Sequence, residues 1–308
     1  MKRLICIFLA LALLCLCSGC EKVSQETVFA MNTVMDLKIW GTDREKGLQT
    51  VTQLLQDLES IWSNQKPDSQ ISKLNNGTAR LTETEQQLLD KVTALSQRTG
   101  GAFDPRLHGV ISLWGFQTGN YRVPSPEELA EAPKTWNLGG ALKGYAGQVA
   151  VARLQALDVE RAILNLGGNV QTYGEKADGT PWSIGIQNPD GGDPIGTVSV
   201  VGTISVVTSG DYQRYFEKDG IRYHHIIDPA TGMPADSGLR SVTILCRDGL
   251  TADALSTALF VMGLQKGSEF WRQSDDFEAV FITTEGKVYA TEGAAFAGCE
   301  YEVIAREN

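Results

Sequence analysis

The chain has 308 residues and a formal net charge of −10, and 42% of its residues are hydrophobic while 21% are charged. That length can bury a complete core, as one large domain or as two closely joined lobes. The excess of acidic over basic residues argues against nucleic acid as a partner. The sequence shows no internal repeat and no low-complexity segment.

Residues 1–19 have the pattern of a secretory signal peptide. Lys2 and Arg3 precede an apolar run at 4–16, which is too short for a comfortable membrane span and ends before small residues. Cys20 follows a Ser-Gly pair and resembles the cysteine of a bacterial lipoprotein box, so we expect it to be lipidated. The alternative is a plain signal peptide with incidental cysteines.

Lipidation at Cys20 would make residues 20–27 a short polar tether. The protein is then expected to be exported and lipid-anchored to the extracytoplasmic face of a bacterial cell membrane. Loss of residues 1–19 removes two basic residues and no acidic one, so the formal charge changes from −10 to −12.

Only two cysteines, Cys246 and Cys299, lie beyond the signal and the lipidation site. They can form at most one disulfide, so neither a cysteine-stapled scaffold nor a zinc cluster is indicated. Cys246 stands in an alternating apolar run, which predicts a buried and inert thiol.

The N-terminal half predicts one strand followed by helices. Alternation of apolar and polar residues over 27–40 predicts the strand, and helical periodicity runs over 43–64 and 82–99, with a short helical or turn segment at 71–75. The second long helix ends at Gly100-Gly101. Residues 117–135, rich in proline, are expected to form a surface loop with a short helix.

The C-terminal half alternates strands with helices irregularly. Predicted strands lie at 162–166, 182–186, 197–207, 221–227, 241–246, 279–283 and 287–291. One predicted helix is opened by the stretch 137–146 and runs to about 157, and another is opened by the stretch 248–257 and runs to about 262. Several strands are two-faced, which favours an α+β architecture of mixed sheets with flanking helices over a doubly wound parallel sheet. We expect a single large domain over residues 28–308.

The stretch Asn137–Ala146 has the composition of an anion-binding turn. Gly139 and Gly140 permit a tight bend before a helix, whose free N–H groups and dipole favour an anion, and Lys143 adds a positive charge. The glycine spacing fits neither a Walker A loop nor a dinucleotide fingerprint. An ordinary strand-to-helix turn is the alternative.

Asp253 and Thr257 are four residues apart at the start of a predicted helix, so their oxygens share one face. Such a pair is half of a site for a hard cation such as Mg²⁺. The alternative is that Asp253 only complements the helix dipole. Similarly, the Ala102-Phe103-Asp104 run before Pro105 is either a turn or a contact to a nucleotide.

Several short motifs occur in one order along the chain. They are Met31-Asn32-Thr33, residues 67–75, Gly100–Pro105, Asn137–Ala146, Ile163–Asn169, Thr208–Tyr212, His225–Gly232 and Ala252–Gly263. In this order they resemble the ApbE-type FAD:protein FMN transferase family over nearly all of the mature chain. The resemblance implies Mg²⁺-dependent cleavage of FAD, with transfer of the FMN half to a threonine or serine hydroxyl of a target protein and release of AMP.

The resemblance also implies roles for single residues. Metal positions would be the Gly140 carbonyl, the Asp253 carboxylate and the Thr257 side chain. Positions for FAD would be Met31, Ala102, Phe103, Asp104, Asn137, Lys143 and Ile227. Asn137 departs from the acidic residue usual at the head of its motif, and residues 64–66 lack the aromatic that often stacks on the cofactor.

His225 is the candidate base for the acceptor hydroxyl and would act with Asp253 and Lys143, because neutral imidazole suits proton abstraction near pH 7. The alternatives are that His225 only holds the turn at Asp228, or that the metal and Lys143 suffice. His224 would face the opposite side of a strand.

The same resemblance implies partners. The acceptor would be a flavin-carrying subunit of a membrane-bound redox complex, and a lipid anchor would hold enzyme and acceptor at one surface. Two other functions share these residues: a Mg²⁺-dependent FAD pyrophosphatase that uses water as acceptor, and a flavin-binding lipoprotein without catalysis.

Overall fold

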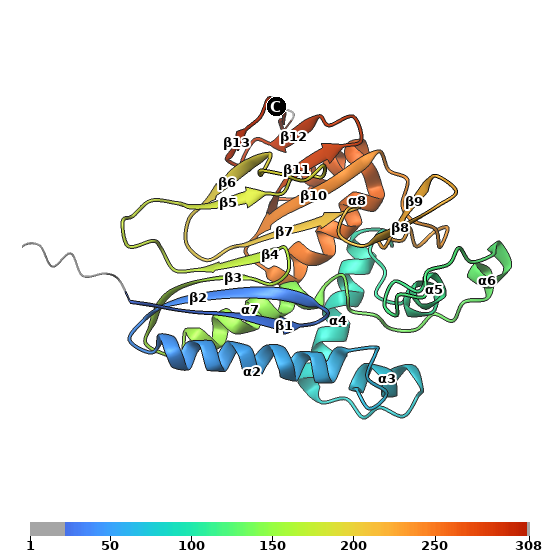
Figure 1. The fold of residues 1–308 in the computed structure, drawn as a ribbon, viewed down its shortest axis with the longest axis horizontal. Coiled ribbons are helices and arrows are strands. Elements are labelled where there is room, and N and C mark those ends of the chain that lie inside the picture. Colours follow the sequence, from blue (N-terminus) through green and yellow to red (C-terminus); the bar gives the residue numbers. More distant parts are fainter. Residues whose placement is uncertain (1–21, 307–308) are drawn as a thin grey trace, which may run out of the picture.

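The computed structural model describes residues 22–306 as three layers around a nine-stranded sheet (Figure 1). Helices α2 (Arg44–Trp62), α7 (Leu142–Leu154) and α8 (Gly249–Arg272) lie against one face. A three-stranded sheet of order β13-β6-β5 covers part of the other face. The predicted α+β architecture in a single domain is confirmed.

The large sheet has the strand order β1-β2-β3-β4-β7-β10-β11-β12-β14. All of its neighbouring strands are antiparallel except β12 and β14. Its strands are β1 (Val23–Ala30), β2 (Thr33–Gly41), β3 (Val159–Asn165), β4 (Asn169–Tyr173), β7 (Ser205–Gly210), β10 (Leu239–Cys246), β11 (Phe277–Thr283), β12 (Val288–Thr291) and β14 (Tyr301–Ile304).

Both faces of the central strands are buried, which explains their nearly continuous apolar runs. In β11, Ala279 and Phe281 pack in the core beneath the helices, whereas Val280 and Ile282 pack in the core beneath the small sheet. Alternation on a strand sends successive side chains to opposite faces, so one apolar run contributes to two cores. The small sheet consists of β5 (Trp182–Ile186), β6 (Gly196–Val200) and β13 (Phe296–Gly298).

The predicted strand at 27–40 is wrong in one respect, because it is a hairpin of β1 and β2. Met31 and Asn32 both have positive φ, of 51° and 59°, and form a two-residue turn. No Asn-Gly or Asp-Gly pair signals this turn in the sequence. Val23–Thr27, expected to be tether, belong to β1 and pair with β2, which shortens the expected tether. Residues 1–21, with Cys20, lie outside the described residues.

The helices of the N-terminal half follow their sequence signals. Helix α4 (Glu83–Arg98) begins in a capping box, in which Thr82 accepts from the Glu85 N–H and Glu85 accepts from the Thr82 N–H. Arg98 in its last turn binds Asp276 through two nitrogens, at 2.6 and 2.7 Å, and so ties α4 to the loop before β11. The short segment α3 (Gln70–Asn75) is helical as predicted.

Other predictions needed correction where turns interrupt the chain. The predicted strand at 197–207 is two strands in different sheets, β6 and β7, because Gly202 at φ 72° breaks the run. Helix α8 extends beyond the predicted end, with a break at Gly263, where φ is 79° and ψ is 174°. Strands β4, β8, β13 and β14 and helix α5 (His108–Trp114) were not predicted.

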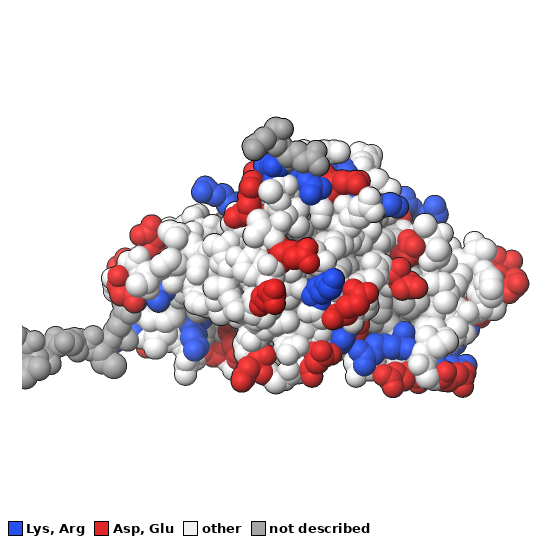
Figure 2. All heavy atoms as spheres, turned by 90° about the horizontal axis from the view of Figure 1, so that it is seen from above, with Lys and Arg blue, Asp and Glu red and all other residues white. Residues whose placement is uncertain are grey.

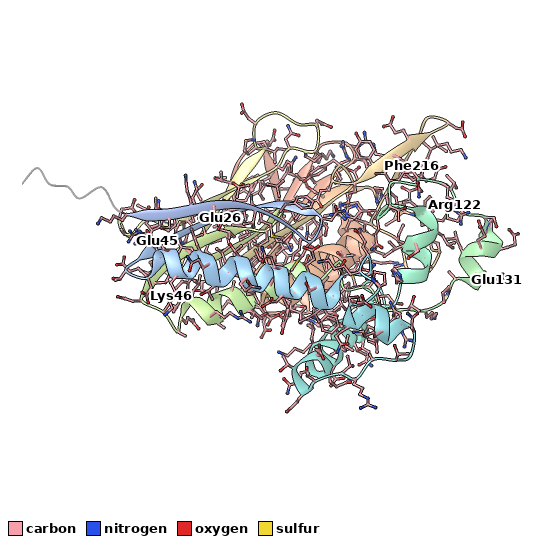
Figure 3. All side chains as sticks on the ribbon, turned by 60° about the horizontal axis from the view of Figure 1, so that its bottom comes forward. Glu26, Glu45, Lys46, Arg122, Glu131 and Phe216 are labelled. Atoms are coloured by element: carbon pink, nitrogen blue, oxygen red, sulfur yellow. The ribbon has the colours of Figure 1, made fainter. Side chains whose placement is uncertain are left out.

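A lateral arm projects from the edge of the molecule in Figure 1. It consists of α5, α6 (Pro126–Glu131) and the hairpin of β8 (Tyr215–Lys218) and β9 (Ile221–His224). An aromatic cluster holds its parts together; its members are Trp114, Phe116, Tyr121, Phe216 and Tyr223, with ring centroids 5.2 to 6.3 Å apart. Figure 3 shows Phe216 at the same end of the molecule as Arg122 and Glu131 of the α5–α6 segment.

The surface carries charges of both signs. On the face seen in Figure 2, lysine and arginine are interspersed with aspartate and glutamate and form no extended basic area. Within residues 22–306, no helix combines the length and apolar character needed to cross a membrane. Cys246 is buried as predicted and Cys299 is exposed, and both are free thiols.

Leu37 and Val34 on β2 offer a matched test of the packing. Leu37 is fully buried and Val34 is 57% exposed. Leu37→Ala should lower the free energy of unfolding by about 2–5 kcal/mol, whereas Val34→Ala should change it by less than about 0.5 kcal/mol. Denaturant unfolding measures both, and similar losses would show that the assigned face of β2 is wrong.

Candidate active site

The first turns of α7 and α8 meet through two glycines. A side chain on Gly144 would overlap the carbonyl oxygen of Gly249 and approach Cβ of Asp253 to 2.7 Å. This close approach lets the Gly144 N–H donate to Oδ2 of Asp253 at 2.8 Å. The N–H is one of the free donors of the first turn of α7, so Asp253 from one helix satisfies the end of the other.

The three expected metal positions converge at this contact. A Cβ built on Gly140 would lie 3.3 Å from Oγ1 of Thr257 and 3.4 Å from the Phe103 ring. Asp253 is 3% exposed, one turn of α8 before Thr257. The hydroxyl of Ser209, at the end of β7, lies 3.3 Å from Oγ1 of Thr257. The glycine turn and the start of α8 therefore lie side by side.

The donors at this point are suited to a hard cation. A carboxylate, a hydroxyl and a backbone carbonyl supply only oxygen, and Mg²⁺ prefers oxygen with few carboxylates, completing its shell with water and substrate phosphate. Within residues 22–306 no group of three or more histidine, cysteine, aspartate or glutamate side chains is placed to hold a metal ion. The residues present therefore fit Mg²⁺.

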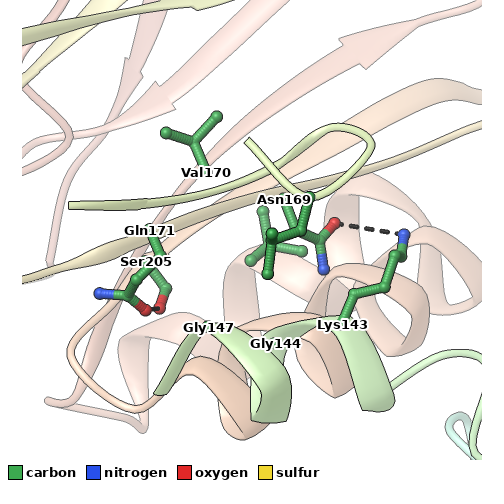
Figure 4. Close-up of a pocket in the computed structure, with 9 residues that line it drawn as sticks. Lys143, Gly144, Gly147, Asn169, Val170, Gln171 and Ser205 are labelled. Atoms are coloured by element: carbon green, nitrogen blue, oxygen red, sulfur yellow. Dashed lines mark hydrogen bonds between the residues drawn. The ribbon is translucent and has the colours of Figure 1, made fainter. Parts of the chain in front are cut away.

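Lys143, in the first turn of α7, contacts the first residue of β4. Its Nζ donates to Oδ1 of Asn169 at 3.4 Å (Figure 4). Burial lowers the pKa of Lys143, the Asp253 carboxylate raises it and the Arg214 charge lowers it again. Asn169 is 3% exposed, and its Nδ2 has no hydrogen-bond partner among the described residues. Asn169 thus fixes the position of the ammonium.

A crevice between α7 and strands β4 and β7 adjoins this pair (Figure 4). Its lining residues are Lys143, Gly144, Gly147, Leu166, Asn169, Val170, Gln171, Ser205 and Val207. Its volume of about 160 Å³ is below the range of ligand pockets, so it is a gap in the packing beside the site and does not hold a nucleotide.

His225 is held by the carbonyl of Arg214, which lies just before β8. The His225 N–H and Nδ1 lie 3.0 and 3.2 Å from that oxygen. A carbonyl only accepts, so Nδ1 carries the proton and Nε2 keeps a free lone pair. Burial lowers the pKa of His225 to about 3, with further contributions from the Arg214, His224 and Lys143 charges. The imidazole is therefore neutral near pH 7.

The arrangement does not support a purely local role for His225 at the Asp228 turn. The backbone of Asp228 and its Oδ1 bond to Ala230, Thr231, Gly232 and Met233, and none of these bonds involves His225. His224 has different neighbours, as expected. It accepts from the Ile226 N–H, its Nε2 donates to the carbonyl of Ala235, and its ring meets Phe260 edge-on.

The residues expected to bind FAD differ in what their side chains contact. Met31 occupies the strained hairpin turn, where its N–H donates to Glu59 at 3.2 Å. Asn137 accepts from the Gly139 N–H at 2.7 Å and Asp104 accepts from the Arg106 N–H at 2.8 Å, so both shape their own loops. Ile227 is buried against the aromatic cluster, which leaves its backbone for any contact with a cofactor.

Ala102 follows Gly101 directly and is partly buried against the main core, beside the buried ring of Phe103. The structure therefore brings Gly140, Lys143, Asp253, Thr257 and Phe103 together.

Sequence reasoning assigned no role to several polar residues of this site. Asn169 and Ser209 lay inside quoted motifs, and Arg214 lay just past one, but nothing in their spacing indicated a contact. Asn169 approaches Lys143 from β4, a strand that was not predicted, and Arg214 reaches the site from the arm. Their positions depend on how distant strands pair, which no local pattern reports.

Comparison with known proteins shows the family of the chain. The model of the ApbE family matches residues 31–281, more than half of the chain. The chain belongs to the ApbE family. The matched region contains every expected metal position and every expected FAD position of the site.

Relatives and solved structures of the family match over most of their length. FAD:protein FMN transferases of Treponema pallidum and Klebsiella pneumoniae are each 33% identical, with 80% and 85% of this chain and 79% and 90% of theirs covered. The ApbE protein of Thermotoga maritima has a TM-score of 0.82 at 31% identity, covering 88% of this chain and 97% of its own. The apo flavinyl transferase ApbE of Pseudomonas stutzeri has a TM-score of 0.77 at 29% identity, covering 91% and 98%.

Gly144 should tolerate no side chain. Gly144→Ala would force α7 away from α8, and overpacking of this kind lowers the free energy of unfolding by about 1–3 kcal/mol. Gly147→Ala on the same helix is the control, because its Cβ would meet only the Gln171 side chain, at 3.1 Å. Thermal unfolding compares the variants; equal melting temperatures would show that the helices do not meet at Gly144.

Proposed function

We propose that this protein is a Mg²⁺-dependent FAD:protein FMN transferase. The observation that carries the proposal is the meeting of Lys143 and the α7 N-terminus with Asp253 and Thr257 of α8. A diphosphate needs a positive charge and N–H donors on one side and a cation on another before its phosphorus reacts. The relatives named above carry this activity in their names.

The acceptor in this proposal is a threonine or serine hydroxyl of a target protein. Its oxygen bonds to the phosphorus of the FMN half, the bond from that phosphorus to the bridging oxygen breaks, and AMP leaves with that oxygen. When bound at Gly140, Asp253 and Thr257, Mg²⁺ neutralises charge on the phosphate oxygens. Lys143, positioned by Asn169, binds a phosphate oxygen of the substrate.

His225 receives the hydroxyl proton at Nε2. Its Nδ1–H bond to the Arg214 carbonyl fixes the ring and the tautomer. The lowered pKa keeps the ring neutral in the free protein. A bound diphosphate and the acceptor raise its basicity, because negative charge favours the protonated form. His225, Asp253 and Lys143 then act on one phosphorus centre.

We further propose that the protein is exported and that Cys20 carries a lipid. Because β1 begins at Val23, only residues 20–22 separate the anchor from the folded domain, roughly 10 Å of extended chain. Such a short tether holds the folded domain near the membrane surface. It favours an acceptor on the same surface, such as a flavin-carrying subunit of a membrane redox complex, through effective concentration.

Product analysis separates transfer from its alternatives. Purified protein is mixed with FAD and Mg²⁺, with and without a threonine-containing acceptor protein, and nucleotides are resolved by HPLC while the acceptor is weighed by mass spectrometry. AMP and an FMN-sized adduct that appear only with acceptor support transfer. FMN and AMP without acceptor would instead indicate FAD hydrolysis, and unchanged FAD would indicate binding alone.

Asp253→Asn should remove the only carboxylate of the metal site and lower kcat by at least about 100-fold. Asp248→Asn is the matched control, since it removes the same charge from the N-cap of α8 while asparagine still caps the helix. Steady-state AMP release under saturating FAD and Mg²⁺ measures both. Near-normal turnover of Asp253→Asn would remove the metal assignment.

A further inference from the structure

Arg214 places a positive charge at the site that no acidic residue offsets. It lies between β7 and β8 and is partly buried. Its Nη2 donates to the carbonyl of Asn32 at 3.1 Å, and within residues 22–306 it forms no ion pair. Burial lowers the pKa of Arg214. A partly buried guanidinium with one neutral partner has unused donors and an uncompensated charge.

Arg214 shares its surroundings with two other site residues. Its backbone carbonyl binds both the N–H and Nδ1 of His225. Its charge is also close enough to Lys143 to lower the pKa of that ammonium. Among the described residues, the acidic group whose charge acts on Lys143 is Asp253, which already accepts from the Gly144 N–H. Two cations therefore face one carboxylate, so this part of the site is suited to an anion of more than one negative charge.

We propose that Arg214 is a catalytic residue that binds the flavin-side phosphate of FAD. This is the phosphate that is transferred with the FMN half. The proposal rests on the proposed function and adds a residue to it. A planar guanidinium presents paired N–H donors that match two oxygens of one phosphate. Because Nη2 also holds the Asn32 carbonyl, the hairpin turn at Met31 and Asn32 orients the guanidinium before substrate arrives.

Because Arg214 lies beside His225, we assign it to the flavin-side phosphate of FAD and not to the adenosine-side phosphate. The acceptor hydroxyl must lie within hydrogen-bond reach of Nε2 of His225 and must attack the phosphorus of the FMN half. The transferred phosphate is therefore the one nearest to His225, which is bonded to the backbone of Arg214. During transfer the negative charge spreads over the oxygens of that phosphate, where a guanidinium stabilises it.

Binding of the two half-products tests the assignment without turnover. FMN binding is followed by flavin fluorescence and AMP binding by calorimetry, each with Mg²⁺, for the wild type, Arg214→Gln and Arg214→Lys. Loss of one charge-assisted contact should weaken FMN binding by at least about tenfold in Arg214→Gln and leave AMP binding unchanged. Arg214→Lys should bind FMN more tightly than Arg214→Gln but less tightly than the wild type. Lysine keeps the positive charge but lacks the paired N–H donors of the guanidinium.

Arg222→Gln is the matched control. Arg222 lies on β9 of the same hairpin, where it binds Glu217 at 3.4 Å and covers the Tyr215 ring. The control removes the same charge from the hairpin, so it should bind FMN and AMP as the wild type does. Equal FMN weakening in Arg222→Gln and Arg214→Gln would overturn the proposal, since the effect would then be one of general charge.

Kinetics supply the second readout. With FAD and acceptor saturating, Arg214→Gln should lower kcat about 10²- to 10³-fold, and Arg214→Lys should restore part of it. Wild-type FMN affinity in Arg214→Gln, or equal losses of FMN and AMP affinity, would overturn the assignment. If Arg214→Gln fails to fold, the FMN and AMP affinities of Arg214→Lys decide in the same way. Absence of transfer by the wild type would instead refute the proposed function, and the binding contrast would still be measured.

Discussion

The close contact between α7 and α8 is the constraint on which the site depends. Two glycines, Gly144 and Gly249, let the first turns of these helices approach until backbone touches backbone. At that distance the Asp253 carboxylate satisfies a free N–H of α7 and stays almost fully buried. A buried carboxylate without such a donor would be costly, so the glycines and the aspartate are required together.

From this contact the rest of the centre follows in space. The start of α7 carries Lys143 and the glycine turn, the start of α8 carries Asp253 and Thr257, and β7 adds Ser209 behind them. The sheet beneath fixes the relative position of these two helix starts, because α7 packs on β4 and α8 packs on β7 and β10. Two helix N-termini and a lysine therefore meet beside an oxygen-donor site, an arrangement suited to phosphate chemistry with a hard cation.

The lateral arm adjoins the segment that orients His225, the proposed base. Its aromatic cluster packs against the β8–β9 hairpin, and Arg214, just before β8, presents its carbonyl to His225. One backbone oxygen thus fixes the tautomer of the proposed base, while the Arg214 side chain reaches back to the β1–β2 turn. Short contacts thus join His225, the Arg214 guanidinium and the turn at Met31 and Asn32, which lie far apart in the chain. A small movement of the arm would therefore affect all three.

The sequence by itself determined the class of fold, the long amphipathic helices and the pairs that act within one turn of helix. Asp253 and Thr257 share a face because of helical period, and Thr82 with Glu85 starts α4 because of local hydrogen bonding. Only the tertiary structure decided what depends on turns without a residue signal and on strand pairing. It split 27–40 and 197–207 into separate strands and joined Lys143 to Asn169. It also turned Asn137 inward on its own loop and brought Arg214 to His225. Local periodicity records which face of an element is buried, whereas contacts between distant elements arise from the packing of the whole chain.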